Sequence, residues 1–174
     1  MARVRVQPTG RESPFGEDEI IVSKTDLKGR ITYANDVFLR VSNYTSREIL
    51  GAPHSIIRHP EMPRCVFKLL WDTIKAGEEI FAYVLNMAKN GDHYWVFAHV
   101  TPTFDDAGAV TGYHSNRRKP DPAQIKKIKP LYDSLLAIEK RAPDRKQGMQ
   151  QSYDHLIADL RAKGITYDEF VFSV

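Results

Sequence analysis

The sequence predicts an α+β domain with a five-stranded antiparallel sheet and helices over one face, followed by C-terminal helices. Two short β-rich segments come first, then a mainly helical stretch, then three more β-rich segments separated by tight turns. Beyond Pro120 the apolar residues instead recur at helical spacing, with lysines between them. We therefore expect residues 19–120 to form the main domain and residues 121–174 a C-terminal helical extension. Residues 1–18 have few apolar side chains and are expected to form a flexible arm or a loosely docked cap.

The first two strands are predicted to form a hairpin. The segments 20–22 and 31–33 are rich in β-branched residues, and the turn at 26–29 separates them. Asn35 follows in the position of a helix cap, and a short helical pattern runs over 36–41.

Two further helices are expected before the third strand. Residues 45–48 offer a capping box for a short helix that ends at Gly51. A longer amphipathic helix has Pro63 in its first turn and ends at Gly77. Its apolar face comprises Val66, Phe67, Leu70, Trp71 and Ile74.

The last three strands are predicted to form a meander. Segments 80–87 and 93–103 are joined by Lys-Asn-Gly-Asp at 89–92, and Asn-Gly is the strongest short signal for a hairpin. A second turn at 105–108 leads to a final strand through 110–113.

The C-terminal extension is predicted to hold two amphipathic helices. Pro130 interrupts the first, which is expected to be kinked or divided there. Residues 142–148 are expected to be a linker, and the second helix begins near Met149 and is capped by Gly164. The apolar C-terminal segment 167–172 must dock against something. The apolar faces of these helices fit both folding back on the sheet and forming a homodimer.

Composition and charge exclude several classes of protein. The net charge of +3 is too small for nucleic-acid binding, and Arg117, Arg118 and Lys119 are interpreted as a solvated strand edge. The single cysteine, Cys65, makes no internal disulfide and fits a reducing compartment. No apolar run approaches the roughly 20 residues that cross a bilayer, so we expect a cytoplasmic protein without direct membrane insertion. We expect no enzyme, because no nucleophile–base pair, paired carboxylates or phosphate loop is present.

Polar residues in the middle of the sequence are candidates for a ligand site. Asn86 lies on a strand whose alternate neighbours are apolar, so its amide projects onto an apolar face. A buried amide without a partner costs about 1 to 3 kcal/mol, so Asn86 either meets a ligand or caps a neighbouring turn. Arg58 and His59 precede the long helix, where a guanidinium and free backbone amides together suit a phosphate. The alternative is that Arg58 pairs with Glu61 or Glu48.

Trp71, His54 and His59 also have alternative interpretations. Trp71 lies on the apolar side of its helix, where it either packs in the core or stacks near a ring-shaped ligand. His54 and His59 are each either structural or a haem ligand, since a haem-binding domain needs one well-placed imidazole.

This order of elements resembles the PAS fold, an antiparallel sheet with helices over one face that leave a small-molecule cavity. The stretches TDLKGRITYANDVFLRVSNYTSREILGAPHSIIRHPEMP and KNGDHYWVFAHVTP are similar to the PAS sensor of Aer-type aerotaxis receptors, which hold FAD. The resemblance covers residues 19–140, and RHPEMP followed by KNGDHYWV is its specific signature. The whole chain, with its YDEF ending, resembles the stand-alone, CetB-like PAS proteins of bipartite energy-taxis systems.

The resemblance implies a cytoplasmic redox or energy sensor that binds FAD. A separate membrane-bound transducer of the methyl-accepting chemotaxis type would receive its signal and recruit it to the inner membrane. His54 stands where the related LOV domains place their adduct-forming cysteine, so blue-light adduct chemistry is not expected. Aer-type sensors have a Trp where this chain has Ile80. The residues expected to contact the cofactor are Asn35, His54, Arg58, His59, Trp71 and Asn86.

Two alternatives remain open at the level of sequence. One is a cofactor-free PAS interaction module with residues 121–174 as its contact surface. The other is a haem-based oxygen sensor.

Overall fold

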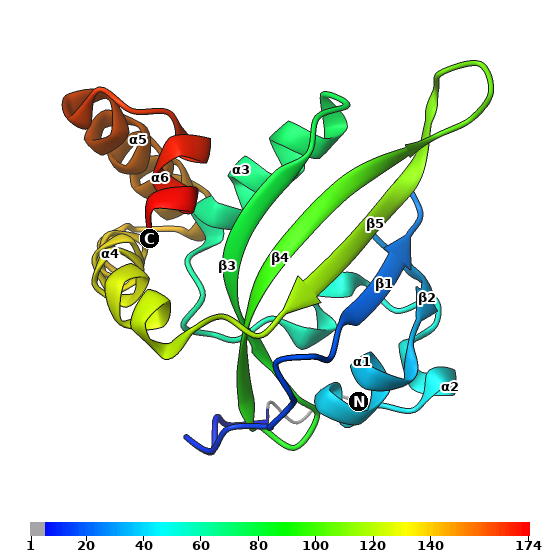
Figure 1. Ribbon diagram of the computed structural model, residues 1–174. Coiled ribbons are helices and arrows are strands. Elements are labelled where there is room, and N and C mark those ends of the chain that lie inside the picture. The colour runs from blue at the N-terminus through cyan, green and yellow to red at the C-terminus, as the bar shows by residue number, and fades with distance from the viewer. Residues whose placement is uncertain (1–5) are drawn as a thin grey trace.

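A five-stranded antiparallel sheet of order β2-β1-β5-β4-β3 forms the centre of the molecule. The computed structural model describes residues 6–174, so the first five residues of the predicted N-terminal arm lie outside the described residues (Figure 1). The strands are β1 (Ile21–Thr25), β2 (Ile31–Ala34), β3 (Ile80–Met87), β4 (His93–Phe104) and β5 (Val110–Arg118). The predicted α+β class and its five strands are confirmed.

Four short helical elements connect β2 to β3, and three helices follow β5. The connecting elements are α1 (Asp36–Ser42), α2 (Ser46–Ile49), the 3-10 helix η1 (His54–Ile57) and α3 (Arg64–Lys75). The C-terminal helices are α4 (Pro122–Arg141), α5 (Arg145–Lys163) and α6 (Tyr167–Ser173).

Local sequence signals explain where several of these elements begin and end. The side chain of Asn35 accepts the Phe38 N–H and caps α1, and Thr45 and Glu48 form the predicted capping box of α2. The β3–β4 hairpin has the predicted Asn-Gly turn, with Gly91 at a φ of +93°. Gly164 ends α5 in the left-handed conformation, as predicted.

The main core lies between the sheet and the connecting helices. Alternate residues of β4 are buried, and α3 packs against β3 and β4 with its apolar face. Core residues with almost no exposure include Ile21, Ile31, Phe38, Ile49, Ile57, Ile74, Ile80, Tyr94 and Val96.

Residues 9–13 of the N-terminal segment are docked against the β3–β4 turn. Thr9 N–H donates to Gly91 C=O at 3.0 Å, and Ser13 N–H donates to His93 C=O at 2.8 Å. His93 N–H in turn donates to Arg11 C=O at 2.8 Å. The described part of this segment therefore runs alongside the end of the sheet (Figure 1).

The C-terminal extension differs from the sequence prediction at two points. Of the two alternatives at Pro130, the division is wrong, because α4 is continuous from Pro122 to Arg141 with Pro130 inside it, and the kink stays a prediction. The predicted linker is also too long, since α5 begins at Arg145. Its earlier start is explained by Asp144, whose side chain accepts backbone N–H groups of the first turn.

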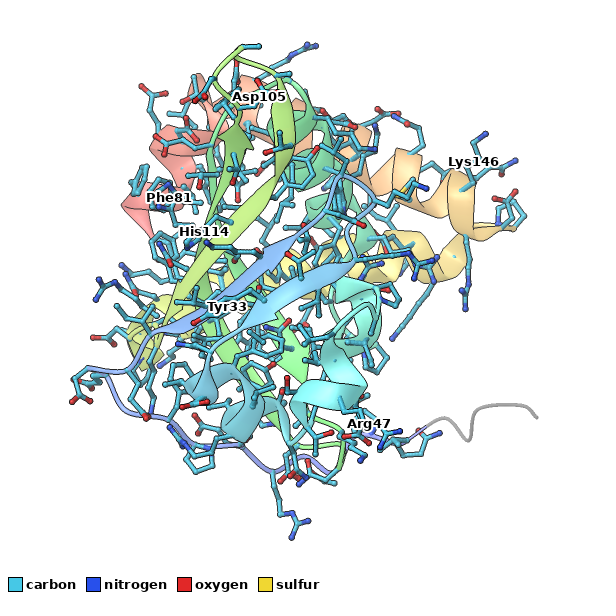
Figure 2. All side chains as sticks on the ribbon, turned by 90° about the vertical axis from the view of Figure 1, so that its right-hand side faces the viewer. Tyr33, Arg47, Phe81, Asp105, His114 and Lys146 are labelled. Carbon is cyan, nitrogen blue, oxygen red and sulfur yellow. The ribbon has the colours of Figure 1, made fainter. Side chains whose placement is uncertain are left out.

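The extension folds back beside β3, which is one of the two arrangements that the sequence allowed (Figure 1). The Tyr132 hydroxyl donates to the Tyr83 carbonyl, and the Tyr167 hydroxyl donates to the Phe81 carbonyl at 2.8 Å. The Phe172 ring packs on the Phe81 ring with centroids 4.8 Å apart, and Figure 2 shows Phe81 beside α6. Among the described residues, no helix combines the length and the apolar character needed to span a membrane.

Candidate functional site

A cavity of about 310 Å³ lies between the sheet and the helices η1 and α3. Its volume is at the lower end of the range for small-molecule sites. Strands β1, β3, β4 and β5 form one wall, and most of the lining is apolar. The apolar lining residues are Pro53, Ile57, Phe67, Leu70, Trp71, Ile74, Val84, Ala98, Val100 and Tyr113.

The Asn86 side chain lies on the cavity wall and is 4% exposed. Its alternate neighbour on β3, Val84, lines the same wall, as the strand period predicts. No hydrogen bond joins the Asn86 amide to another described residue, so it does not cap a turn there. A buried amide of this kind calls for a hydrogen-bonding partner inside the cavity.

Arg117 on β5 is 2% exposed and also lines the cavity. Its guanidinium donates to the Ser23 hydroxyl and, over 3.2 Å, to Nε2 of His54, and it lies over the Phe38 ring at 4.9 Å. Burial lowers the pKa of Arg117 to about 10, so the group is charged at neutral pH. Among the described residues, Arg117 has no ion pair, and its Nε has no hydrogen-bond partner.

The imidazole of His54 is held neutral by the same network. A guanidinium can only donate hydrogen bonds, so His54 Nε2, 3.2 Å from Arg117 and 3.1 Å from the Ser23 hydroxyl, must accept. Burial lowers the pKa of His54 to about 3, and the positive charges of Arg117 and Arg58 act in the same direction. The lone pair of Nε2 is therefore engaged within the protein.

Arg58 lies on the cavity wall beside Asn86, because the backbones of these two residues form an isolated bridge. Its guanidinium stacks on the Phe67 ring at 3.9 Å, and burial lowers its pKa. Within the described part of the chain Arg58 makes no ion pair, so the alternative interpretation, a clamp with Glu48 or Glu61, is wrong. Glu48 instead pairs with Lys89.

The predicted phosphate site at the start of α3 needs a second correction. The backbone N–H groups of Arg64 and Cys65 donate to the carboxylate of Glu139, each at 3.0 Å. These amides are therefore engaged and are not free to join Arg58 in holding a phosphate. Sequence reasoning missed this contact because Glu139 is 75 residues from Arg64 along the chain.

Trp71 closes one side of the cavity against the β1–β2 turn. Its ring meets Tyr113 edge-on with centroids 5.5 Å apart. A Cβ atom at Gly29 would lie 2.8 Å from the Trp71 ring, and Gly29 has a φ of +75°. Glycine is thus required there for the backbone angle and for the close approach of the tryptophan.

Two of the predicted contact residues lie outside this cavity. The Asn35 amide accepts N–H groups of Val22 and Phe38 and donates to Ile20 C=O, so it caps α1 and joins that helix to the β1 segment. His59 is buried, and its Nδ1 accepts the Glu61 N–H at 3.1 Å. It lines a second cavity beside the N-terminal segment and α4. The structure brings together His54, Arg58, Trp71 and Asn86.

The cavity is electropositive. Lys28, Arg58 and Arg117 line it, and no Asp or Glu does so among residues 6–174. The interpretation of Arg117 as part of a solvated edge was wrong, because it lies on the same face of β5 as Tyr113 and Ser115. Counting alternate positions forward from Tyr113 would have found it.

Comparison with known proteins identifies the domain. Residues 31–116 match the sequence model described as the PAS fold. Over 129 residues, or 74% of this chain, the sequence is 43% identical to the aerotaxis receptor of Escherichia coli. This chain belongs to the PAS family. Its PAS domain is of the aerotaxis-receptor type, as the sequence predicted.

More distant relatives share the same domain. The PAS protein is 26% identical over 99 residues to the nitrogen fixation regulatory protein of Klebsiella pneumoniae. Among solved structures, the dark structure of the blue-light photoreceptor Aureochrome1 LOV is similar to this chain. The match covers 63% of this chain and 82% of the Aureochrome1 LOV chain. The TM-score is 0.57 at 25% identity. The chain spans 25% of the length of the aerotaxis receptor and 20% of the Klebsiella protein.

Proposed function

We propose that this PAS protein is a redox sensor for aerotaxis or energy taxis that binds FAD in the cavity. The observation that carries the proposal is a mainly apolar cavity holding an unpartnered amide, Asn86, and a buried guanidinium without a carboxylate, Arg117. Both groups call for a ligand with hydrogen-bonding atoms and negative charge. The resemblance to aerotaxis receptors, which implied FAD, supports the same cofactor.

The residues present fit a flavin. An isoalloxazine ring needs apolar walls for its faces and hydrogen-bonding groups for its polar edge, and Asn86 offers both a donor and an acceptor. Trp71 and Phe67 would contribute to the walls. Arg58 and Lys28 are the cations that would attract the diphosphate of FAD.

The sensing step depends on how the chain responds to charge in the cavity. A bound flavin supplies reversible electron transfer, which adds negative charge or a proton to the ring. The guanidinium of Arg117 would stabilise the added negative charge, because it has no internal counter-ion. The amide of Asn86 can rotate to present its donor or its acceptor. Since these residues lie on β5 and β3, a change in their hydrogen bonds would bias the sheet.

The haem alternative is less well supported by the geometry. A haem ligand requires an imidazole nitrogen with a free lone pair facing the cavity. His54 Nε2 is engaged with Arg117 and Ser23, and His59 does not line this cavity. The cofactor-free alternative leaves the Asn86 amide without a hydrogen-bond partner and the Arg117 charge without a counter-ion among the described residues.

The proposed partner is a separate membrane-bound transducer of the chemotaxis type. The similarity to the aerotaxis receptor supports an output to the chemotaxis machinery. The protein itself would be cytoplasmic and reach the inner membrane through this partner, as in the CetB-like systems that it resembles.

Visible absorption of the freshly purified protein tests the cofactor. The proposal predicts the absorption bands of oxidised flavin, their bleaching on reduction, and release of FAD on denaturation. A Soret band would instead indicate haem. A colourless protein after expression with ample flavin would refute the proposal.

A further inference from the structure

The first turn of α3 is held by a side chain from the C-terminal extension. Glu139 of α4 accepts the Arg64 N–H through Oε2 and the Cys65 N–H through Oε1, each at 3.0 Å. Both oxygens of one carboxylate therefore bind two consecutive amides of another helix. This contact joins two parts of the chain that are far apart in sequence.

The α3 helix has no cap of its own. The first N–H groups of a helix lack partners within the helix, and a side chain at the N-cap position usually accepts one of them. Here the N-cap residue is Pro63, which makes no side-chain cap hydrogen bond. A carboxylate at this end also interacts favourably with the helix dipole. Glu139 thus supplies the cap that the local sequence of α3 omits.

The position of Glu139 is fixed in turn by α5. The Ser152 hydroxyl of α5 donates to Glu139 Oε1 at 2.8 Å. At Gly148 of α5, a Cβ atom would lie 2.7 Å from the Glu139 carbonyl oxygen and 3.1 Å from its Cα. The two helices therefore touch at Glu139, where α5 contacts both the backbone and the carboxylate of this residue.

The helix that Glu139 caps is also a wall of the cofactor cavity. Phe67, Leu70 and Trp71 of α3 line the cavity within two turns of Arg64. Phe67 also carries the stacked guanidinium of Arg58. A displacement of the first turn of α3 would therefore move cavity-lining side chains.

We propose that Glu139 is a positioning residue that couples the cofactor cavity to the packing of the C-terminal extension. The inference rests on the proposed function for the identity of the ligand. Because coupling between two sites is reciprocal, an extension that positions α3 for the flavin must itself respond to flavin. The coupling passes through the three hydrogen bonds of one carboxylate.

The test compares Glu139→Gln with the wild-type chain and with Asp133→Asn. Asp133 is also on α4, and among residues 6–174 its exposed carboxylate pairs only with Lys129, so this control removes a charge from the same helix without touching α3. FAD affinity of the apo-protein is measured by fluorescence titration. Hydrogen exchange of the amides in the first turn of α3 and in α5 is measured with and without FAD.

Three results are expected. Glu139→Gln weakens FAD binding by about fivefold or more, a typical size for coupled sites, while Asp133→Asn leaves it unchanged. Exchange at Arg64 and Cys65 accelerates in Glu139→Gln even without FAD. FAD slows hydrogen exchange in α5 of the wild-type chain, and this slowing is absent in Glu139→Gln. Ser152→Ala, which keeps the carboxylate but removes one of its partners, shifts all three readouts in the same direction by less.

Unchanged FAD affinity together with unchanged protection of α5 in Glu139→Gln would overturn the inference. A wild-type chain that binds no flavin would refute the proposed function instead. In that case the exchange of the apo-protein still decides whether Glu139 positions α3, since unchanged rates at Arg64 and Cys65 would overturn the role of the carboxylate.

Discussion

A buried guanidinium without a carboxylate partner is the residue that most constrains what the cavity can bind. Transferring a charged guanidinium from water to the protein interior costs free energy, and proteins usually offset this cost with an ion pair. The described partners of Arg117 are neutral: the Ser23 hydroxyl, the His54 imidazole and the Phe38 ring. Arg117 is therefore expected to favour negative charge on a bound ligand and to lower the stability of the protein without a ligand.

Replacing Arg117 with Gln separates these two effects. Because the positive charge favours the more negative form of the ring, the midpoint potential of bound flavin should fall by about 30 mV or more, or about 1.4 kcal/mol for a two-electron couple. The apo-protein should be no less stable in urea than the wild type. Arg118→Gln, which alters the exposed neighbour, should change neither quantity. A potential unaltered by Arg117→Gln would remove Arg117 from the sensing step.

The neutral state of His54 predicts a specific dependence of stability on pH. Its folded-state pKa, about 3, is lower than the unfolded value of about 6.5, so below pH 6.5 the unfolded chain binds a proton that the folded chain excludes. The free energy of unfolding should therefore fall as pH drops from 6.5, by up to about 1.4 kcal/mol per pH unit from this group. Urea unfolding at pH 7 and pH 5.5 measures it. His54→Gln should show a shallower slope, and an identical slope would contradict the assignment.

At the scale of elements, regular patterns were predictable and long-range contacts were not. Period-2 alternation and the Asn-Gly turn predicted the β3–β4 hairpin, and helical spacing predicted α3. Such signals are local, because turn chemistry and side-chain periodicity depend on neighbouring residues. The start of α5 was misplaced because the capping role of Asp144 was not recognised.

The candidate site was predictable to a similar extent. Asn86, Arg58, His54 and Trp71 were found from strand alternation, their place before a helix, and family resemblance. The cap by Glu139 was missed because it depends on distant segments of the chain meeting in space. Arg117 was missed because strand alternation was not followed beyond Tyr113.

The docking of the N-terminal segment depends on one glycine. Gly91 has a φ of +93°, and a Cβ atom there would lie 2.4 Å from the Gln7 carbonyl oxygen. Gly91→Ala should therefore destabilise the protein by about 1 to 3 kcal/mol and accelerate hydrogen exchange at Thr9 and Ser13. Gly108→Ala is the matched control, since Gly108 also has a positive φ but nothing lies within 4 Å of its Cβ position. Equal effects of the two substitutions would show that the close approach does not matter.

At the scale of the whole molecule, the C-terminal extension covers the β3 side of the sheet and leaves β2 on the opposite side (Figure 1). Tyr33 of β2 is 47% exposed, whereas the rings near Phe81 pack against α6. This asymmetry makes the extension part of the folded unit rather than a free appendage.

The hydrogen bond of Tyr167 provides a measure of that docking. Tyr167→Phe leaves the Phe81 carbonyl without its donor and should lower the free energy of unfolding by about 1 kcal/mol or more. Urea unfolding measures the loss. Tyr33→Phe alters an exposed hydroxyl and should have almost no effect. If both substitutions were neutral, the extension would contribute little to stability.

The central claim is that the cavity itself holds the flavin, and titration of the apo-protein with FAD tests it most directly. We predict saturable binding of one FAD per chain. Asn86→Leu should weaken that binding roughly five- to 150-fold, because the polar edge of the ring loses hydrogen bonds worth about 1 to 3 kcal/mol. Met87→Leu, at the next residue of β3, should bind as the wild type does. An affinity that Asn86→Leu leaves unchanged, or no saturable binding at all, would contradict the account.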